Sequence, residues 1–391
     1  MREARSWTLS LTAVALIGCG PPTDRPLTER TDSAGIELVT SNVDDRPLPW
    51  RLERRIALGG AEEGPESFFR LPPGTVASDA RGQIYVLDPL RHRVVVFTPD
   101  GTFVRSVGGE GAGPGELESP GALSVGPDGV LSVFDFGKGA LVRFGPDGTV
   151  LPQHPLPFFP WTGPSRHFEV TSEGVLVSTM LPPAPEGMFH QALRLLGPAD
   201  TVLVAERIFP RPGMVRYPTC GGGLNYPPIF EAQVVWAAHD RRIVAVDGPE
   251  YAFTLFEGAR PIRKVRAGFP LRASSEALAL AELGEGMTIN FGRGPCRIPP
   301  REMVEGRGFA EAVPWIEAVM ISPTDDIWIH RKGVGQEIPA AVDVFDRTGL
   351  YLGRLPEGSP FPLVFVDDTT FGAAETDEMD VTRLVLYRIA R

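Results

Sequence analysis

Hydrophobic and polar residues alternate along most of the chain, in short runs separated by glycine, proline and aspartate. Residues 83–88 read QIYVLD and residues 130–135 read VLSVFD, and each is followed by a second apolar run, RVVVF (93–97) or ALVRF (140–144). A period of two residues is typical of β-strands. The intervening turn residues favour antiparallel hairpins, so the pattern predicts an all-β fold.

This pattern repeats without a gap between residues 74–102 and residues 121–149. Gly82 corresponds to Gly129, Asp88 corresponds to Asp135, and both units end in Pro-Asp-Gly-Thr. Each unit predicts four strands, the last two joined by the Pro-Asp-Gly turn. A single sheet of this kind cannot bury both of its faces, so units with a period of 40 to 50 residues are expected to pack as propeller blades.

Weaker copies continue to the end of the chain and give six units in all. The last unit, from residue 361 onward, has only three strands, and residues 50–60, WRLERRIALGG, can supply the fourth. Such a strand would close the ring and remove the exposed edges of an open sheet. We therefore expect a six-bladed β-propeller of four-stranded antiparallel blades over residues 34–391, closed by an N-terminal strand.

One segment, residues 267–314, departs from the strand pattern. SSEALALAELGEGM (274–287) has serines before an apolar run and a glycine after it, which predicts a short helix, and residues 299–315 contain a second candidate. We expect a helical insertion between blades four and five. It should cover the face that carries the loops between second and third strands, which we call the capped face.

The first 33 residues predict a cellular location. Arg2 and Arg5 precede an apolar stretch that is too short to span a bilayer but typical of a signal peptide, here residues 1–18. Leu-Ile-Gly-Cys (16–19) resembles the lipobox of bacterial lipoproteins, in which the cysteine, here Cys19, is lipidated. Residues 19–33 then read as a flexible tether. The alternatives are an ordinary secretory signal or a short buried strand.

The remaining cysteines, Cys220 and Cys296, lie in segments rich in glycine and proline. An exported chain meets oxidising conditions, so we expect a disulfide between them, the alternative being two separate thiols. Neither has a second cysteine or histidine at the spacing of a zinc site.

The glycine-rich stretch GGEGAGPGELESP (108–120) raises the question of a phosphate-binding loop. Such a loop needs a helix N-terminus after it, whereas the residues that follow predict another strand. A related stretch occurs at residues 59–72, so we interpret both as connectors between repeats.

Composition and charge narrow the classes of partner. The 391-residue chain has 42% hydrophobic residues, enough for a large core, and a formal net charge of −11. A charge of this sign argues against nucleic acid and anionic lipid surfaces as partners.

Six cationic side chains are expected near one another on the capped face. They lie in DPLRHR (88–93), DFGKGA (135–140) and HRKG (330–333), and the candidates for ligand binding are Arg91, His92, Lys138, His330, Arg331 and Lys332. One interpretation is a cationic ring that attracts an anionic or carbohydrate ligand. The other is turn residues paired with Asp88 and Asp135. The aromatic stretch at 158–164 is expected near the same rim.

These features resemble the six-bladed β-propeller lipoproteins related to NHL-repeat domains. The resemblance rests on the GGxxxGP connectors, the strand-ending Asp88 and Asp135, the Pro-Asp-Gly turns and the closing TDEMDVTRLVLYRI. It implies the fold and leaves the activity open, because propellers serve as both binding proteins and enzymes.

We expect a lipid-anchored protein of the cell envelope, facing the periplasm or exterior, that binds a protein, peptide or glycan without catalysis. The chain has no G-x-S-x-G or H-E-x-x-H motif, and we expect no metal, no cofactor, no nucleic acid, membrane contact through the lipid alone, and a monomer. The alternative is an envelope lyase or hydrolase at the channel mouth, with His92, His330 or Arg91 as acid–base or electrostatic groups.

Overall fold

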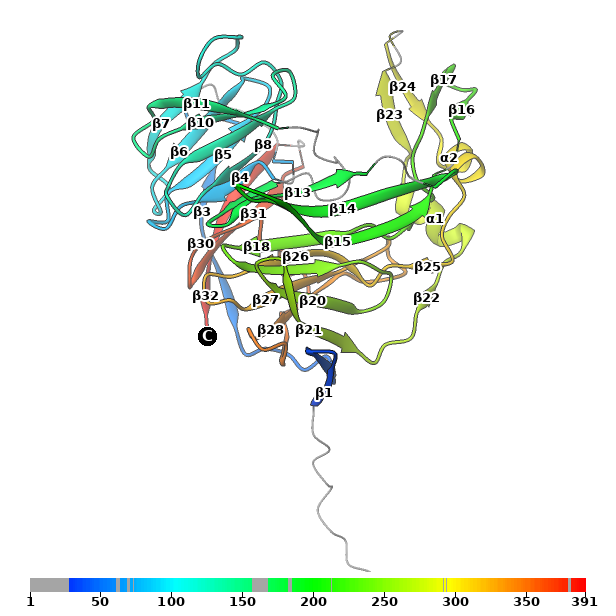
Figure 1. The fold of residues 1–391 in the computed structure, drawn as a ribbon. Helices are drawn as coiled ribbons and strands as arrows, with labels where there is room; N and C mark the ends of the chain where they lie inside the picture. Colours follow the sequence, from blue (N-terminus) through cyan, green and yellow to red (C-terminus); the bar gives the residue numbers. More distant parts are fainter. Residues whose placement is uncertain are drawn as a thin grey trace, which may run out of the picture.

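The structure is a computed structural model that describes residues 28–60, 64–68, 71–72, 74–156, 168–181, 185–211, 213–290, 292, 294–378 and 381–391. The expected signal peptide, Cys19 and the aromatic stretch at 158–164 lie outside these residues. The described chain forms six blades arranged as a ring (Figure 1).

The first three blades are sheets whose strands follow one another in chain order. Blade one contains β4 (Val76–Ser78), β5 (Ile84–Asp88), β6 (Arg93–Phe97) and β7 (Phe103–Gly108). Blade two contains β8 (Pro120–Val125), β9 (Leu131–Asp135), β10 (Ala140–Phe144) and β11 (Val150–Pro155). Blade three contains β12 (Phe168–Thr171), β13 (Gly174–Met180), β14 (Met188–Leu196) and β15 (Thr201–Pro210).

The last three blades repeat this order, and the sixth takes its outer strand from the N-terminal region. Blade four contains β18 (Val235–His239), β19 (Arg242–Val246), β20 (Ala252–Glu257) and β21 (Arg260–Ala267). Blade five contains β26 (Ile316–Ile321), β27 (Ile327–Arg331), β28 (Ala341–Phe345) and β29 (Tyr351–Arg354). Blade six contains β30 (Val364–Asp367), β31 (Thr370–Thr376), β32 (Thr382–Ala390) and β3 (Arg51–Leu58).

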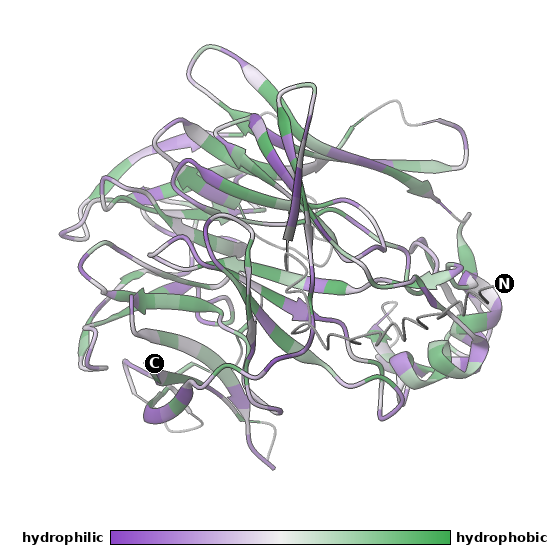
Figure 2. Cartoon of the chain, turned by 90° about the horizontal axis from the view of Figure 1, so that it is seen from below, coloured by the Kyte–Doolittle hydropathy of each residue, from purple (hydrophilic) through white to green (hydrophobic). Residues whose placement is uncertain are grey.

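Both faces of each blade are apolar, and each face packs against a neighbouring blade. In β5, Ile84 and Val86 pack toward blade six, whereas Tyr85 and Leu87 pack toward blade two. Six hydrophobic clusters lie between successive blades in this way, the last of them between blades six and one. The hydrophobic colouring follows the strands of the blades (Figure 2). The core is therefore a closed ring of interfaces.

Turn chemistry fixes the ends of the strands. Gly101 of the first Pro-Asp-Gly turn has φ +84°, and a Cβ there would lie 3.0 Å from side-chain atoms of Ile56 and Leu58 in β3. Only glycine adopts this conformation without strain. The buried Asp135 accepts hydrogen bonds from the backbone N–H groups of Glu118 (2.7 Å) and Ser119 (3.0 Å), so it ties its loop to the incoming connector.

Residues 28–58, which we call the N-terminal strap, contact the outer strands of three blades. β1 (Thr28–Ser33) pairs with β2 (Ile36–Ser41), and β2 pairs in parallel with β21 of blade four. Leu48 N–H then donates to the Arg354 carbonyl of blade five (2.8 Å), and β3 pairs with β32 of blade six. The strap thus runs along blades four, five and six.

The strap differs from the sequence expectation at its start, since we placed residues 19–33 in a flexible tether. The segment 28–33, TERTDS, contains no hydrophobic residue, so it carries no strand pattern. It pairs nevertheless, because its backbone groups meet those of β2. Blade four consequently becomes a sheet of six strands rather than four.

A small subdomain, which we call the cap, rises beside blades three to five (Figure 1). It consists of β16 (Val215–Tyr217), β17 (Gly222–Leu224), β22 (Arg272–Ala273), α1 (Glu276–Leu283), β23 (Met287–Asn290), β24 (Pro295–Ile298), α2 (Pro300–Arg307) and β25 (Ala312–Val313).

The cap has a core of its own, which includes the buried Tyr217, Ile298 and Met303. The expected disulfide is present, with the Cα atoms of Cys220 and Cys296 5.7 Å apart, and it joins the connectors on either side of blade four. Of the helices in the described residues, none is long and apolar enough to cross a membrane.

A buried ion pair within blade five is hydrogen-bonded to a tyrosine of blade four. The Arg331 guanidinium contacts the Asp343 carboxylate through Nε (2.5 Å) and Nη2 (2.9 Å), and Asp343 also accepts hydrogen bonds from the Tyr251 and Tyr351 hydroxyls. Asp45 of the strap lies 2.6 Å from Arg331 Nη2. Blade four, blade five and the strap therefore meet at one guanidinium.

We expect Asp343→Asn to lower the free energy of unfolding by about 3 kcal/mol, because Arg331 would stay buried without its bidentate counter-ion. Asp45→Asn is the matched control, since its side chain is 47% exposed and should cost about 1 kcal/mol or less. Urea unfolding followed by tryptophan fluorescence measures both. If both variants lost the same free energy of unfolding, burial of the Arg331–Asp343 pair would not determine how much the pair stabilises the fold.

Candidate functional site

The centre of the ring contains a cavity of about 900 Å³. Its walls come from the first strands of the blades, β4, β8, β12, β18, β26 and β30. Most side chains that line the walls are small and apolar, among them Val76, Val125, Val235, Ala318 and Val364. A concave, mostly apolar site of this size is typical of small-ligand pockets.

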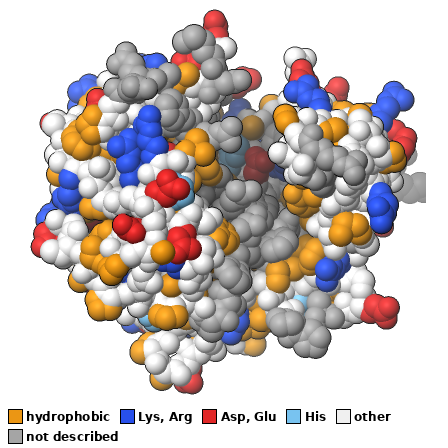
Figure 3. Space-filling view, turned by 90° about the horizontal axis from the view of Figure 1, so that it is seen from above, with side chains coloured by type: hydrophobic (Ala, Val, Ile, Leu, Met, Phe, Trp, Pro, Cys, Tyr) orange, Lys and Arg blue, Asp and Glu red, His pale blue; other side chains and the backbone are white. Residues whose placement is uncertain are grey.

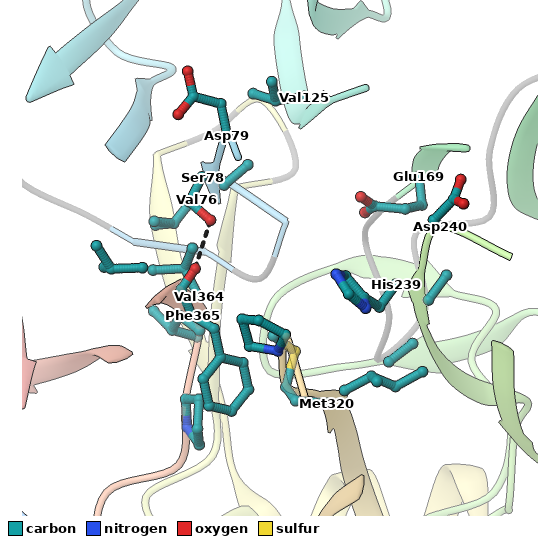
Figure 4. Close-up of a pocket in the computed structure, with 18 of the residues that line it drawn as sticks. Val76, Ser78, Asp79, Val125, Glu169, His239, Asp240, Met320, Val364 and Phe365 are labelled. Carbon is teal, nitrogen blue, oxygen red and sulfur yellow. Dashed lines mark hydrogen bonds between the residues drawn. The ribbon is translucent and has the colours of Figure 1, made fainter. Parts of the chain in front are cut away.

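The polar groups of the cavity lie mainly where first strands end and turns begin. Ser78 and Asp79 end β4, whereas His239 and Asp240 end β18, and Glu169 projects from β12 (Figure 4). Aspartate is common at these positions because its side chain can accept backbone hydrogen bonds of the turn. The same preference brings charged groups to the lining of the cavity.

On the β4 side, the polar groups are already engaged. The Ser78 hydroxyl donates to the Phe365 carbonyl (2.5 Å), which joins β4 to blade six. The Asp79 carboxylate accepts from the Arg81 guanidinium (3.1 Å), from the Tyr85 hydroxyl (3.3 Å) and from the turn backbone. These contacts indicate a structural role for Ser78 and Asp79.

On the β18 side, two exposed groups remain at the edge of the cavity. His239 Nδ1 lies 3.1 Å from Asp325 Oδ1, which orients the imidazole ring. Asp240, at φ +48°, accepts a hydrogen bond from the Ser172 N–H (2.9 Å). Partial burial opposes ionisation of Asp240, but the Ser172 hydrogen bonds outweigh it and hold the pKa of this carboxyl below its ordinary value.

Glu169 is the least ordinary group in the site. Its carboxyl points into the cavity near His239 and Asp240 (Figure 4). Burial among apolar strands raises the pKa of Glu169 to about 8, and a hydrogen bond with Ser124 of β8 opposes the shift only in part. Glu169 is therefore largely protonated at neutral pH.

Near the cap, Glu317 of β26 also lines the cavity. Although burial works in the opposite direction, His330 and Lys332 lower the pKa of Glu317 to about 2. His330 Nδ1 is 3.3 Å from the Glu317 carboxylate, and Lys332 Nζ is 3.1 Å from it and 2.7 Å from Glu282 of α1. Lys332 thus links the cap to the wall of the cavity.

The other predicted cationic residues also have intramolecular partners. Arg91 donates to the Ser67 carbonyl (3.2 Å), and His92 Nδ1 lies 2.9 Å from the Leu117 carbonyl. Arg331 is buried against Asp343, as described above. A ligand would have to displace these contacts, so a role of the six residues in ligand binding stays a prediction.

Lys138 holds the glycine-rich connector at 108–120 in its conformation. Its Nζ donates to the backbone carbonyls of Ala112 (3.2 Å), Gly113 (2.9 Å) and Glu116 (2.8 Å). The connector therefore wraps around an ammonium group of its own blade. Arg91 and Arg93 lie 3.9 Å from Asp88, so pairing within the turns accounts for part of the cationic cluster.

The structure does not bring the six cations together as one set. Arg91 and His92 belong to blade one, Lys138 to blade two, and 330–332 to blade five. Among the described residues, Arg91, His92 and Lys138 contact connectors between blades. Arg331 contacts its own blade and the strap, and Lys332 contacts the cap. Glu169, His239 and Asp240 instead line one cavity. The sequence could have indicated Glu169 as a site residue, because it is an acid inside a first strand that is otherwise apolar.

The space-filling view shows one face hollowed between two lobes, with acidic and histidine side chains visible in the hollow (Figure 3). Among the described residues, no group of three or more His, Cys, Asp or Glu side chains is placed to hold a metal ion.

Six four-stranded blades around a central channel define the class, and the chain is a six-bladed β-propeller. A family model described as a 6-bladed beta-propeller matches residues 75–172, which cover blades one and two and the start of blade three. The fold expected from the sequence is confirmed. No curated protein matches the chain.

Solved structures similar to this chain have low sequence identity. A candidate exported protein from Bacteroides fragilis has 11% identity and a TM-score of 0.49, covering 90% of this chain and 98% of its own. A member of the DUF4221 family from Bacteroides vulgatus has 11% identity, a TM-score of 0.47 and coverages of 89% and 99%. Virginiamycin B lyase from Staphylococcus aureus has 11% identity, a TM-score of 0.37 and coverages of 87% and 99%. These similarities carry no information on activity.

The raised pKa of Glu169 predicts a pH-dependent stability. The folded protein keeps the Glu169 proton up to about pH 8, whereas the unfolded chain releases it near the ordinary value of 4.5. The folded state therefore binds more protons between these values, and its free energy of unfolding falls as the pH rises. Glu169→Gln removes this contribution. The free energy of unfolding of the variant, relative to that of the wild type, should therefore increase from pH 5 to pH 8.

Urea unfolding of both proteins at pH 5, 6, 7 and 8 measures the difference. Glu357→Gln, at an exposed loop position, serves as the control and should show no trend. A constant difference between Glu169→Gln and wild type across this range would contradict the raised pKa.

Proposed function

We propose that the protein is a lipid-anchored propeller of the cell envelope that binds a ligand in its central cavity without chemical conversion. The observation that carries this proposal is the cavity of about 900 Å³, with mostly apolar walls and charged groups mainly near the strand ends. The cationic residues of the capped face already have intramolecular partners, so the cavity is the better candidate for the ligand site.

Of the expected ligands, a protein, a peptide or a glycan, the lining favours a peptide segment. The valine and alanine side chains of the walls suit the aliphatic side chains of a peptide. A segment that inserts side chains into the cavity buries apolar surface, at about 25 cal/mol for each Å².

The proposed location in the envelope rests on the N-terminal sequence and is supported by the cysteines. A signal peptide at 1–18 and a lipidated Cys19 would hold the propeller at a membrane surface. Disulfides persist in oxidising compartments such as the periplasm and the cell exterior, and the Cys220–Cys296 bridge fits such a location.

The alternative, an envelope lyase or hydrolase, is favoured by one observation. His239, oriented by Asp325, lines the same cavity as the protonated Glu169, and such a pair could serve as base and acid. These groups differ from the His92, His330 and Arg91 of the sequence-based hypothesis. An enzyme would release an altered ligand, whereas a binding protein would return it unchanged, which mass spectrometry distinguishes.

Filling the cavity tests the binding proposal. We expect Met320→Trp, which adds volume to the wall at β26, to weaken binding of the neutral fluorophore N-phenyl-1-naphthylamine at least about tenfold through steric exclusion. Leu90→Trp is the control, since Leu90 is 65% exposed and does not line the cavity. Both are made in the full chain carrying Cys19→Ser. Unchanged affinity in Met320→Trp would show that the probe binds elsewhere.

The anchor is tested by Cys19→Ser in cells. Since one thioether-linked lipid anchor is the only membrane contact proposed, the variant should move from the membrane fraction to the soluble envelope fraction. Fractionation followed by immunoblotting measures this shift, and Cys220→Ser, which breaks the disulfide instead, should leave the protein at the membrane. Retention of Cys19→Ser in the membrane fraction would contradict lipidation at this site.

A further inference from the structure

We propose that the cavity selects ligand segments in which an apolar stem carries a cationic head, an ammonium or guanidinium group, and that Glu169 receives this head. This inference rests on the proposed function and adds the chemical class of the ligand. A lysine or arginine side chain of a peptide has the required form, because its methylene stem packs on apolar walls while its charge seeks a partner.

The charges that line the cavity are mostly negative. The acidic lining residues are Asp79, Glu169, Asp240, Glu317, Asp367 and Asp368, whereas the basic ones are Arg81 and His239. Arg81 is bound to Asp79, and His239 is bound to Asp325. An apolar cavity with a surplus of acids attracts a cation, and its low-dielectric walls strengthen that attraction.

Glu169 is the acid best placed to receive the head. Asp79 and Glu317 already contact cationic groups of the protein, and Asp240 lies exposed at the edge. Glu169 projects between the edge and the apolar wall formed by residues such as Val76 and Val125 (Figure 4). A stem lying on this wall would bring its head to the Glu169 carboxyl.

The groups that face Glu169 from neighbouring elements are few. Ser124 of β8 supplies a hydroxyl, and His239 and Asp240 lie at the end of β18 (Figure 4). Burial disfavours the ionised carboxylate of Glu169 when no cation is bound beside it. A metal ion is a poorer fit, since hard cations need several converging oxygens and the described residues offer no such group.

Binding of a cation must then be coupled to loss of a proton. With the cavity empty, burial raises the pKa of Glu169 to about 8, so an incoming ammonium group displaces the carboxyl proton to solvent. No bond other than this O–H is broken. By linkage, affinity for the cation increases about fifty-fold between pH 6 and pH 8, while affinity for a neutral ligand of the same shape does not.

The test uses two probes that differ only in the head, 6-phenylhexylamine and 6-phenylhexan-1-ol. Isothermal titration calorimetry with the full chain carrying Cys19→Ser measures both at pH 6, 7 and 8. We expect the amine to bind at least about tenfold more tightly than the alcohol at pH 8, a difference of about 1.4 kcal/mol. Titrations in buffers of different ionisation enthalpy should show release of about one proton at pH 7.

Two variants show which side chain causes the preference for the amine and its pH dependence. Glu169→Gln keeps the shape and a neutral hydrogen-bond donor, so the amine should lose its advantage and its pH dependence. His239→Gln removes the imidazole that lines the same cavity and should keep most of the pH dependence. Dependence that disappears in His239→Gln but persists in Glu169→Gln would overturn the assignment to Glu169.

The outcomes separate this inference from the proposed function. If both probes bind equally and Met320→Trp weakens both, the cavity binds ligands and the cation inference is overturned. If the alcohol binds more tightly than the amine, Glu169 acts as a neutral donor, which also overturns it. If neither probe binds and Met320→Trp leaves the affinity for the neutral fluorophore unchanged, the proposed function itself fails.

Discussion

Each blade is a sheet with an apolar layer on both faces, and neither layer can face water. A neighbour on each side satisfies this requirement for every blade only when the blades form a closed ring, and the six inter-blade clusters are the result. The β3–β32 pairing completes the sixth sheet, so the cluster between blades six and one contains residues from both ends of the chain. The core depends on this closure.

The cavity follows from the same constraint. The first strands of six blades cannot meet at the axis, so their side chains surround a space whose walls are as apolar as the strands themselves. Charged groups enter mainly through the turns at the strand ends. Glu169 of β12 and Glu317 of β26 lie within first strands instead, and the apolar surroundings of Glu169 change its protonation. The chemical character of the site therefore depends on acids placed where the fold expects apolar residues.

The blades were predictable because the repeat, the Pro-Asp-Gly turns and the alternation all describe one sheet. The disulfide was predictable from the cysteine count, and the first helix from its caps. The strand at 28–33 was not, since it pairs through backbone groups and has no apolar residue. The pairing of Lys138 with connector carbonyls, and the raised pKa of Glu169, depend on neighbours distant in sequence, which a local pattern does not record.

The N-terminal strap has a consequence for biosynthesis. Residues 28–58 are made before the blades, yet their partners β21, β29 and β32 are made much later. During synthesis β2 and β3 must wait without these partners, and contacts so far apart along the chain form slowly. A nascent chain that stops before β32 leaves β3 without a partner and the sixth sheet incomplete. The strap is thus made before the blades that it contacts, and β3 is secured only after β32 has been made.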